Sequence, residues 1–372
     1  MIAFVVNGDE QSAMAMRAQA FARHLARRWP IEVGYRRKGR VGSIPQLAWW
    51  LARQRPDAIW VFDMALSGVV ASTLVKPGGA RLIIDTGDVI AELARQSRLR
   101  GRMGVLATSG LERLAEAAAD ALIVRGTAHA ELYAERGIPT TLIPDGVEVD
   151  QFAGVGRREA TRHSLGVTDE LVVGLVGSTV WSPSLGLTYG WDLVEALGQL
   201  RDLPVVGLIV GDGSGIPHLR ERARALDVNH RLRFAGRQPY DTLPDWLSAC
   251  DVCLSTQTND LVGQVRTTGK LPLYMASGRY VLASRVGEAR RVLPDQMLID
   301  YDGTVDRAYP ARLAFRIRTL CEQRDQLDLG TALVDVARRE FDYSVLAERA
   351  DALLRRVVAA RTGLAQDGGL VS

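Results

Sequence analysis

The sequence has little cysteine, with three residues among 372. Three thiols cannot build a disulfide framework, which fits a reducing compartment and predicts a cytoplasmic protein. Cys250 and Cys253 have a CxxC spacing, but no second cysteine pair or nearby histidine completes a zinc site. We therefore interpret both as buried thiols. No pair of the five histidines has metal-ligand spacing, so we expect no metal and no other cofactor.

Long apolar runs are also missing. No run reaches the roughly 18 residues that cross a bilayer. The first residues, MIAFVVNGDE, read as a strand with no basic segment before it, so we expect no signal peptide. Hydrophobic residues make up 47% of the chain and charged residues 24%, which indicates a folded protein. A length of 372 residues exceeds one ordinary core and predicts two domains.

The net charge of +3 is unevenly distributed. Residues 1–110 contain 16 Lys and Arg but only 8 Asp and Glu, so the remainder of the chain is net negative. A basic first half favours an anionic partner, such as phosphate, a phospholipid surface or a lipid-linked acceptor. No recognition motif accompanies the arginines, and we expect no nucleic-acid binding.

Short apolar strands alternate with helical patterns along the whole chain. The strands expected in the first half are 2–6, 31–35, 58–62, 82–85, 121–124 and 140–143. A helix with apolar residues three and four apart, from Met14 to Trp29, follows the first strand. This alternation predicts parallel sheets with helices on both faces.

Residues 205–254 carry the clearest fold signal. An apolar strand at 205–210 runs into the glycine-rich segment Gly211–Gly215, and two further strands end at 236 and 254 with helices between them. Turn glycines then stand at the carboxyl ends of strands, where open α/β sheets bind ligands. The predicted domains are 1–153 and 154–340, with a linker at 154–169. Residues 341–372 are expected to form a C-terminal helix and, after Thr362, a frayed tail.

Four elements in this order resemble motifs of the GT-B glycosyltransferases of family 4, the glycosyl transferases group 1. Leu142–Val147 with Phe152 is similar to the family's "IPNGVD…F", and Val210–Gly213 to its "VGDG". Lys270–Gly278 is similar to "KLxxYMASG", and Val286–Glu288 to the "VGG" that follows. The resemblance covers nearly the whole chain. It implies two Rossmann-like doubly wound domains facing a cleft, the first for the acceptor and the second for a nucleotide sugar. It also implies a C-terminal helix that crosses back onto the first domain.

The resemblance implies a donor diphosphate site made of glycines, cations and hydroxyls. Glycine lets backbone amides approach an anion, and cations before a helix suit a diphosphate. The residues expected to contribute are Gly8, Gly177, Ser178, Gly211, Arg237, Arg266, Thr268, Lys270, Gly287 and Glu288. Glu288 is a candidate for a sugar hydroxyl. The alternatives are a solvated basic helix start at 266–270 and a plain surface arginine at Arg237.

Two aspartates are the candidate catalytic residues. Asp85 and Asp88 follow a strand of the first domain and correspond to the family's "HD" or "DxxD" region. A carboxylate there could orient an acceptor hydroxyl or accept its proton. Alternatively, Asp88 caps the helix that begins at 89–90. Arg17, in the helix that follows the first strand, could face the cleft or lie on the surface.

The chain also departs from the family pattern. Where the family has Gly-Arg and a later Lys-Gly, this chain has Gly177–Ser178 and Tyr189–Gly190, so both cations are missing. Val265 and Leu273 stand where the family has paired glutamates that hold the donor.

The function implied by the resemblance is retaining transfer of a sugar from a nucleotide diphosphate to a glycan, lipid-linked or small-molecule acceptor. Closure of the cleft would exclude water. Two alternatives remain open. The missing cations and glutamates suggest a non-catalytic GT-B protein that binds a glycan or a partner glycosyltransferase, and the fold also occurs in sugar-nucleotide epimerases.

A basic surface in the first domain suggests peripheral contact with the inner face of a membrane. Arginines flank the first helix, a basic run follows at 36–40, and Trp49 and Trp50 begin another helix. Basic amphipathic surfaces with tryptophan bind anionic lipid without crossing it. The alternative is an ordinary core-facing helix with a solvated arginine face.

Overall fold

The computed structural model describes residues 1–96 and 101–360, and these divide into two compact α/β units. The first unit comprises Met1–Gly146, Val265–Thr267 and the segment from Tyr343 onward. The second comprises Val147–Gln264 and Thr268–Asp342. The tail expected to fray after Thr362 lies outside the described residues.

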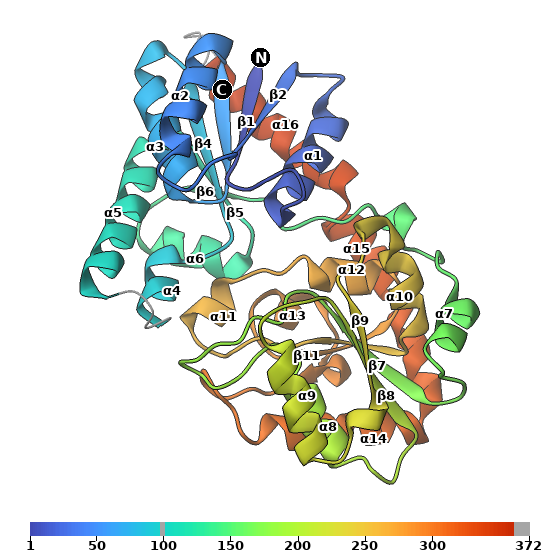
Figure 1. Ribbon diagram of the computed structural model, residues 1–372. Coiled ribbons are helices and arrows are strands. Elements are labelled where there is room, and N and C mark those ends of the chain that lie inside the picture. Colours follow the sequence, from blue (N-terminus) through green and yellow to red (C-terminus); the bar gives the residue numbers. More distant parts are fainter. Residues whose placement is uncertain (97–100, 361–372) are drawn as a thin grey trace, which may run out of the picture. The chain divides into compact units, whose positions relative to one another are not determined.

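A six-stranded parallel sheet forms the centre of the first unit (Figure 1). Its strands are β1 (Ile2–Val6), β2 (Ile31–Tyr35), β3 (Ala58–Phe62), β4 (Arg81–Thr86), β5 (Ala121–Val124) and β6 (Thr140–Leu142). Their order is β2-β1-β3-β4-β5-β6, and every neighbouring pair is parallel. Each of the six predicted strands is confirmed to within one residue at either end.

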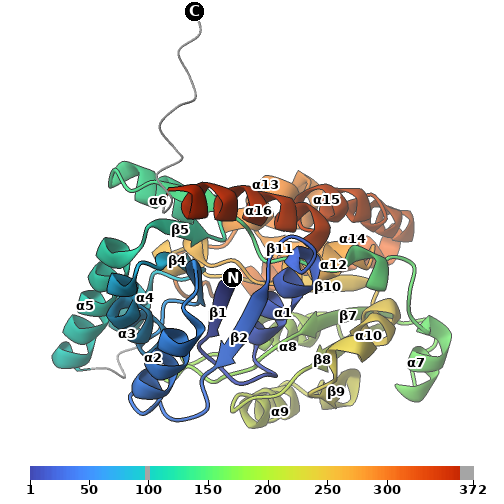
Figure 2. The same ribbon diagram turned by 90° about the horizontal axis from the view of Figure 1, so that it is seen from above.

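Helices cover both faces of this sheet because its strands are apolar on both sides. In β1, Ile2, Phe4 and Val6 join one core cluster, while Ala3 and Val5 join the other. The helices are α1 (Ala13–Leu25), α2 (Ser43–Gln54), α3 (Leu66–Val75), α4 (Ile90–Gln96), α5 (Arg102–Ala118), α6 (Thr127–Glu135) and α16 (Tyr343–Ala359), with the 3-10 helix η1 (Lys76–Gly78). The C-terminal helix α16 lies alongside α1 (Figure 2).

The second unit has its own six-stranded parallel sheet. Its strands are β7 (Leu171–Val176), β8 (Val205–Val210), β9 (Leu232–Gly236), β10 (Val252–Ser255), β11 (Tyr280–Ser284) and β12 (Leu298–Ile299). The order β12-β11-β10-β7-β8-β9 is that of a doubly wound Rossmann sheet. The predicted βαβαβ segment is therefore confirmed.

Short helices connect the strands of the second unit. They are α7 (Arg158–Ser164), α8 (Trp191–Gly198), α9 (Ile216–Ala225), α10 (Leu243–Ala249), α11 (Leu261–Val265), α12 (Lys270–Ala276), α13 (Gly287–Val292), α14 (Tyr309–Glu322) and α15 (Leu333–Glu340). The 3-10 helices are η2 (Val149–Gln151), η3 (Asn229–Arg231), η4 (Tyr240–Thr242), η5 (Asp295–Met297) and η6 (Arg324–Gly330).

Two segments differ from the sequence predictions. The expected linker at 154–169 contains α7, which packs on α10 and whose Arg162 forms an ion pair with Asp251 at 3.1 Å. The helix expected to reach Trp29 ends at Leu25, because the chain turns there to enter β2. Trp29 instead donates its indole N–H to Asp351 of α16 at 2.7 Å.

The packing of α16 gives a stability prediction. Leu354 is fully buried in the core cluster shared with α1. We expect Leu354→Ala to lower the free energy of unfolding by about 2–5 kcal/mol, since it removes buried methyl groups and leaves a cavity. Urea denaturation measures the change. The control is Leu106→Ala on α5, where the same deletion at a 65% exposed side chain should change stability by about 0.5 kcal/mol or less. Equal losses in both variants would contradict the packing of α16.

Candidate functional site

The strand orders place one candidate site in each unit. Ligands of open α/β sheets bind outside the carboxyl ends of the strands where the chain order reverses. In the first sheet the reversal lies at β1 and β3, which are followed by Asn7, Gly8 and Asp63. In the second sheet it lies between β7 and β10, and Gly177 and Ser178 follow β7.

A buried ion-pair network underlies the first of these sites. Asp85, in β4, is completely buried between Arg17 of α1 and Arg125 at the end of β5. Its two carboxylate oxygens accept from Arg17 Nε at 2.9 Å and from Arg125 Nε at 2.7 Å. Burial alone would raise the pKa of Asp85, but Arg125 and Arg17 together hold it below its usual value. Arg17 also donates to the carbonyl oxygens of Ile143 and Pro144 at 2.8 and 2.6 Å.

This network corrects two expectations from the sequence. Asp85 was expected to contact an acceptor hydroxyl, but both of its oxygens are occupied and it has no exposed surface. In this conformation neither carboxylate oxygen of Asp85 is accessible to a substrate. Arg17, offered as a cleft or surface residue, is instead 2% exposed and anchors the carboxyl edge of the sheet.

Asp88 remains accessible near the same edge. Its carboxylate is partly exposed and accepts a hydrogen bond from Arg266 Nε at 2.7 Å. Arg266 belongs to the three-residue segment that groups with the first unit. The arginine expected on the donor diphosphate therefore pairs with the aspartate expected to be catalytic.

Asp63 is a candidate that the sequence analysis missed. It follows β3 with a left-handed φ of +74°, which is uncommon for a residue other than glycine and is often found at functional sites. Its carboxylate accepts the Met64 N–H, and its own N–H donates to the Asp85 carbonyl at 3.0 Å. Burial raises the pKa of Asp63; Arg125 opposes this rise, while Asp88 and Asp85 add to it. Its position directly after a buried strand was the available signal.

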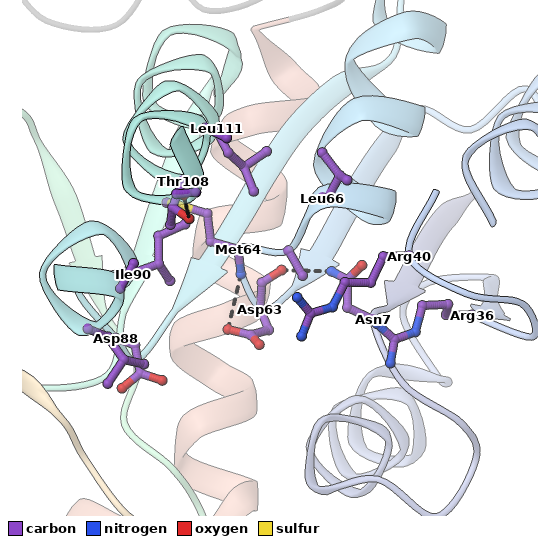
Figure 3. Close-up of a pocket in the computed structure, with 15 residues that line it drawn as sticks. Asn7, Arg36, Arg40, Asp63, Met64, Leu66, Asp88, Ile90, Thr108 and Leu111 are labelled. Carbon is purple, nitrogen blue, oxygen red and sulfur yellow. Dashed lines mark hydrogen bonds between the residues drawn. The ribbon is translucent and has the colours of Figure 1, made fainter. Parts of the chain in front are cut away.

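A pocket of about 770 Å³ opens beside Asp63 and Asp88 (Figure 3). All of its lining residues belong to the first unit. They are Asn7, Arg36, Arg40, Asp63, Met64, Ala65, Leu66, Asp88, Ile90, Leu93, Ala94, Gly104, Ala107, Thr108 and Leu111.

Gly8, expected at the donor site, is not among the residues that line this pocket. A Cβ at Gly8 would lie 2.4 Å from Oγ of Ser12, which caps α1. Gly8 thus permits the close approach of Ser12. The contact expected between Gly8 and the sugar donor stays a prediction.

In the second unit, a lysine lies at the reversal point of the sheet. Lys270 begins α12, and its side chain crosses Gly177, where a Cβ would come within 2.5 Å of Cε. The ammonium nitrogen lies 3.5 Å from the centroid of the Tyr189 ring, a cation–π contact. The Tyr189 hydroxyl in turn donates to the Leu254 carbonyl of β10. Lys270 therefore lies at the carboxyl edge of the second sheet, beside Gly177.

The glycines of this edge act differently from the expectation. The Gly211 amide donates to the Gly236 carbonyl at 2.8 Å, and the Gly177 amide to the Val210 carbonyl at 2.9 Å. The Gly287 amide donates to Oε1 of Gln264 at 3.0 Å. In this conformation none of the three amides is left for an anion. Glycine is needed at Gly211 because a Cβ would lie 1.9 Å from the Gly177 carbonyl oxygen. These residues allow two loops to pack closely.

The remaining predicted donor residues lie along the same edge and stay predictions. Ser178 and Arg237 are exposed and directly follow β7 and β9, while Thr268 is half-buried just before α12. Glu288, in the helix after β11, is buried, and its carboxylate pairs with Arg291 at 2.9 Å.

The two positions where the resemblance expected glutamates carry buried apolar side chains. Val265 is 1% exposed and Leu273 is 8% exposed. Both side chains are taken up by packing.

The interpretation of the cysteines is confirmed. Cys250 and Cys253 are both buried and free, and burial raises the pKa of the Cys253 thiol. Over the two described ranges, no three or more His, Cys, Asp or Glu side chains are grouped to hold a metal.

Part of the basic surface predicted for the first unit forms ion pairs within that unit. Arg28 pairs with Glu348 of α16 at 2.7 Å, whereas Trp49 is 62% exposed with the Arg53 guanidinium over its ring. Within residues 1–96 and 101–360, no helix has both the length and the apolarity that a membrane crossing requires. Peripheral membrane contact stays a prediction.

Comparisons with known proteins agree with this architecture. Residues 170–323, which belong to the second unit except for Val265–Thr267, match the family model described as Glycosyl transferases group 1. This part of the chain is therefore similar to the group 1 glycosyltransferases. A curated relative, the D-inositol 3-phosphate glycosyltransferase of Geodermatophilus obscurus, is 29% identical over 234 residues. The alignment covers 61% of this chain and 48% of that relative, so the chain matches only about half of the relative's length.

Solved structures show that the fold is GT-B. The Anabaena protein Alr3699/HepE, in complex with UDP and glucose, superposes with a TM-score of 0.74 at 18% identity, over 96% of this chain and 100% of that one. The sucrose-phosphate synthase of Thermosynechococcus elongatus superposes with a TM-score of 0.77 at 18% identity, over 96% and 99% of the two chains. The predicted fold class is confirmed.

The buried network gives a prediction about stability and its pH dependence. Asp85→Asn removes the carboxylate that Arg17 and Arg125 contact directly and leaves them only the more distant Asp145, at 3.7 and 3.8 Å, so we expect it to cost about 3–5 kcal/mol of unfolding free energy. Because the folded pKa of Asp85 is lowered, its contribution is complete above the ordinary value of 3.8 and is lost as pH falls through the folded pKa. Denaturation of both proteins between pH 7 and pH 2 measures this, and the two stabilities should converge at the acid end.

The matched control is Asp169→Asn, which changes an exposed aspartate and should leave stability nearly unchanged. A loss of similar size in both variants, or a difference that does not change with pH, would contradict the ion-pair network.

Proposed function

We propose that the chain is a retaining glycosyltransferase that moves a sugar from a nucleoside diphosphate sugar to an acceptor hydroxyl. The observation that carries the proposal is Lys270 at the reversal point of the second sheet, held over Gly177 by the Tyr189 ring. The bound UDP and glucose of the Anabaena structure support a nucleotide-sugar donor on this fold.

The donor site proposed for the second unit uses charge in place of a metal. Lys270 neutralises the diphosphate as negative charge develops on it during departure, and exposed Ser178 and Arg237 add polar contacts along the same edge. Since the family glutamates are absent, we propose that the ribose and the base are held by the loops that follow the strands.

The acceptor site proposed for the first unit is the pocket beside Asp63 and Asp88. The acceptor oxygen forms a bond to the anomeric carbon, and the bond from that carbon to the diphosphate oxygen breaks. The hydroxyl proton passes to a pocket carboxylate. Asp63 is the better placed for this, because Asp88 already pairs with Arg266.

The donor proposal is tested with Lys270→Met. This change keeps the aliphatic contact with Gly177 but removes the charge, and we expect UDP affinity to fall about 10- to 100-fold, since a hydrogen bond to a charged group contributes about 1.5–3 kcal/mol. Calorimetry with UDP, GDP, ADP, CDP and dTDP measures it. The control Lys38→Met removes an exposed lysine of the first unit and should leave affinity unchanged. If the native chain binds none of the five nucleotides, the transferase proposal fails and a non-catalytic protein is favoured.

The acceptor proposal is tested with Asp63→Asn. A carboxylate that accepts a proton must be ionised, so kcat/KM should fall as pH decreases through the raised pKa of Asp63, above the ordinary aspartate value of 3.8. The variant should lose about 10²- to 10⁴-fold in kcat, and this acid limb should disappear. UDP binding by the variant is the control for folding. An unchanged acid limb in the variant would rule out Asp63 as the proton acceptor.

A further inference from the structure

The pocket of the first unit has two chemically different sides. Figure 3 shows Arg36 and Arg40 on one side, Asp88 and Ile90 on the other, and Asp63 between them. Apolar side chains from the end of β3, from α3 and from α4 and α5 make up much of the remaining wall; they are Met64, Leu66, Ile90, Leu93 and Leu111. A ligand that fills this pocket must therefore carry both a polar and an apolar part.

The two arginines supply positive charge that the described protein does not neutralise. The Arg36 backbone N–H donates to the carbonyls of Val6 and Gly8 at 3.1 and 3.2 Å, which fixes this residue beside the end of β1. Neither the Arg36 nor the Arg40 side chain forms an ion pair or hydrogen bond within residues 1–96 and 101–360. Arg36 is only half-exposed, so its guanidinium faces the pocket with part of its hydration removed.

Neither carboxylate of the pocket pairs with Arg36 or Arg40. Asp88 is paired with Arg266, and Asp63 accepts the Met64 N–H. Arg36 is partly buried and Arg40 is exposed, and both line the pocket. Two guanidinium groups without a carboxylate partner are suited to a phosphate group, which they bind through charge-assisted and bidentate hydrogen bonds.

We infer that this pocket binds an acceptor that carries a phosphate group beside an apolar part. The phosphate contacts Arg36 and Arg40, the apolar part lies against Met64, Leu66 and Leu111, and the hydroxyl that receives the sugar lies at Asp63. This assignment of the acceptor class rests on the proposed transfer function. The same chemistry occurs in a soluble phosphate ester and in a phospholipid headgroup, and the test separates these two sources.

The experiment compares two double variants of equal charge. Arg36→Gln with Arg40→Gln removes the pocket cations, whereas Arg37→Gln with Lys38→Gln removes two exposed cations of the same loop that do not line the pocket. Binding of hexyl phosphate, inorganic phosphate and neutral hexanol is measured by calorimetry on the full chain. Co-sedimentation with phosphatidylglycerol and with phosphatidylcholine vesicles is measured in parallel.

We expect the native chain to bind hexyl phosphate more tightly than inorganic phosphate or hexanol. The pocket variant should lose about tenfold or more of this affinity, and the loop variant should keep it. If the pocket variant loses affinity for hexyl phosphate alone, the acceptor is a soluble phosphate ester. If it also loses binding to phosphatidylglycerol vesicles, the acceptor is a phospholipid headgroup. Absence of hexyl phosphate binding, or equal losses in the two variants, overturns the inference.

Nucleotide binding by the same preparations separates this inference from the proposed function. The pocket variant should bind UDP as the native chain does, because its substitutions lie outside the second unit. A chain that binds hexyl phosphate through Arg36 and Arg40 but binds no nucleotide would retain the pocket and refute the transferase. The reverse result would retain the donor site and refute the phosphate-bearing acceptor.

Discussion

The ion-pair network around Asp85 is the interaction on which the first unit depends. One carboxylate joins α1 through Arg17 and the end of β5 through Arg125, and Arg17 continues to the carbonyls of Ile143 and Pro144. Arg17, Asp85 and Arg125 have lost their hydration, and Asp85 compensates most directly for this cost, with Asp145 at 3.7 and 3.8 Å from the two arginines. The Asp85 carbonyl also accepts the N–H of Asp63, so the network fixes the backbone that carries the pocket carboxylate.

The carboxyl edge of the second sheet is built by close packing of backbone loops and by one lysine, Lys270. The loops after β7 and β8 approach so closely that Gly211 has no room for a side chain beside the Gly177 carbonyl. This packing uses up the amides of both glycines, and positive charge must then come from a side chain. Lys270 supplies it, and the Tyr189 ring holds the ammonium group without neutralising it.

The sequence predicted the sheets well and the chemistry of their edges less well. Apolar runs such as 58–62 and 171–176 are buried on both faces, so their composition alone identifies them as central parallel strands. The same reasoning placed ligand sites after these strands. It could not tell that Asp85 points into the protein while Asp63 borders a pocket, because both aspartates stand at the end of an apolar run.

The sequence could not show which residue each side chain or backbone amide contacts in the fold. Arg17 sits on α1, whose other arginine, Arg23, is exposed, and only the fold shows that Arg17 reaches Asp85. Likewise, a glycine pattern identifies a tight loop, but whether its amides face a ligand or another loop depends on contacts with residues far along the chain, such as Gly236 for Gly211. Val265 and Leu273, which stand where the family has glutamates, also show that the fold decides what surrounds a position. These positions are not polar sites left without charge, since both are buried in apolar packing, where a lone carboxylate would be strongly disfavoured. The proposed donor site is therefore assigned to the loops at the edge of the sheet, where Ser178 and Arg237 are exposed.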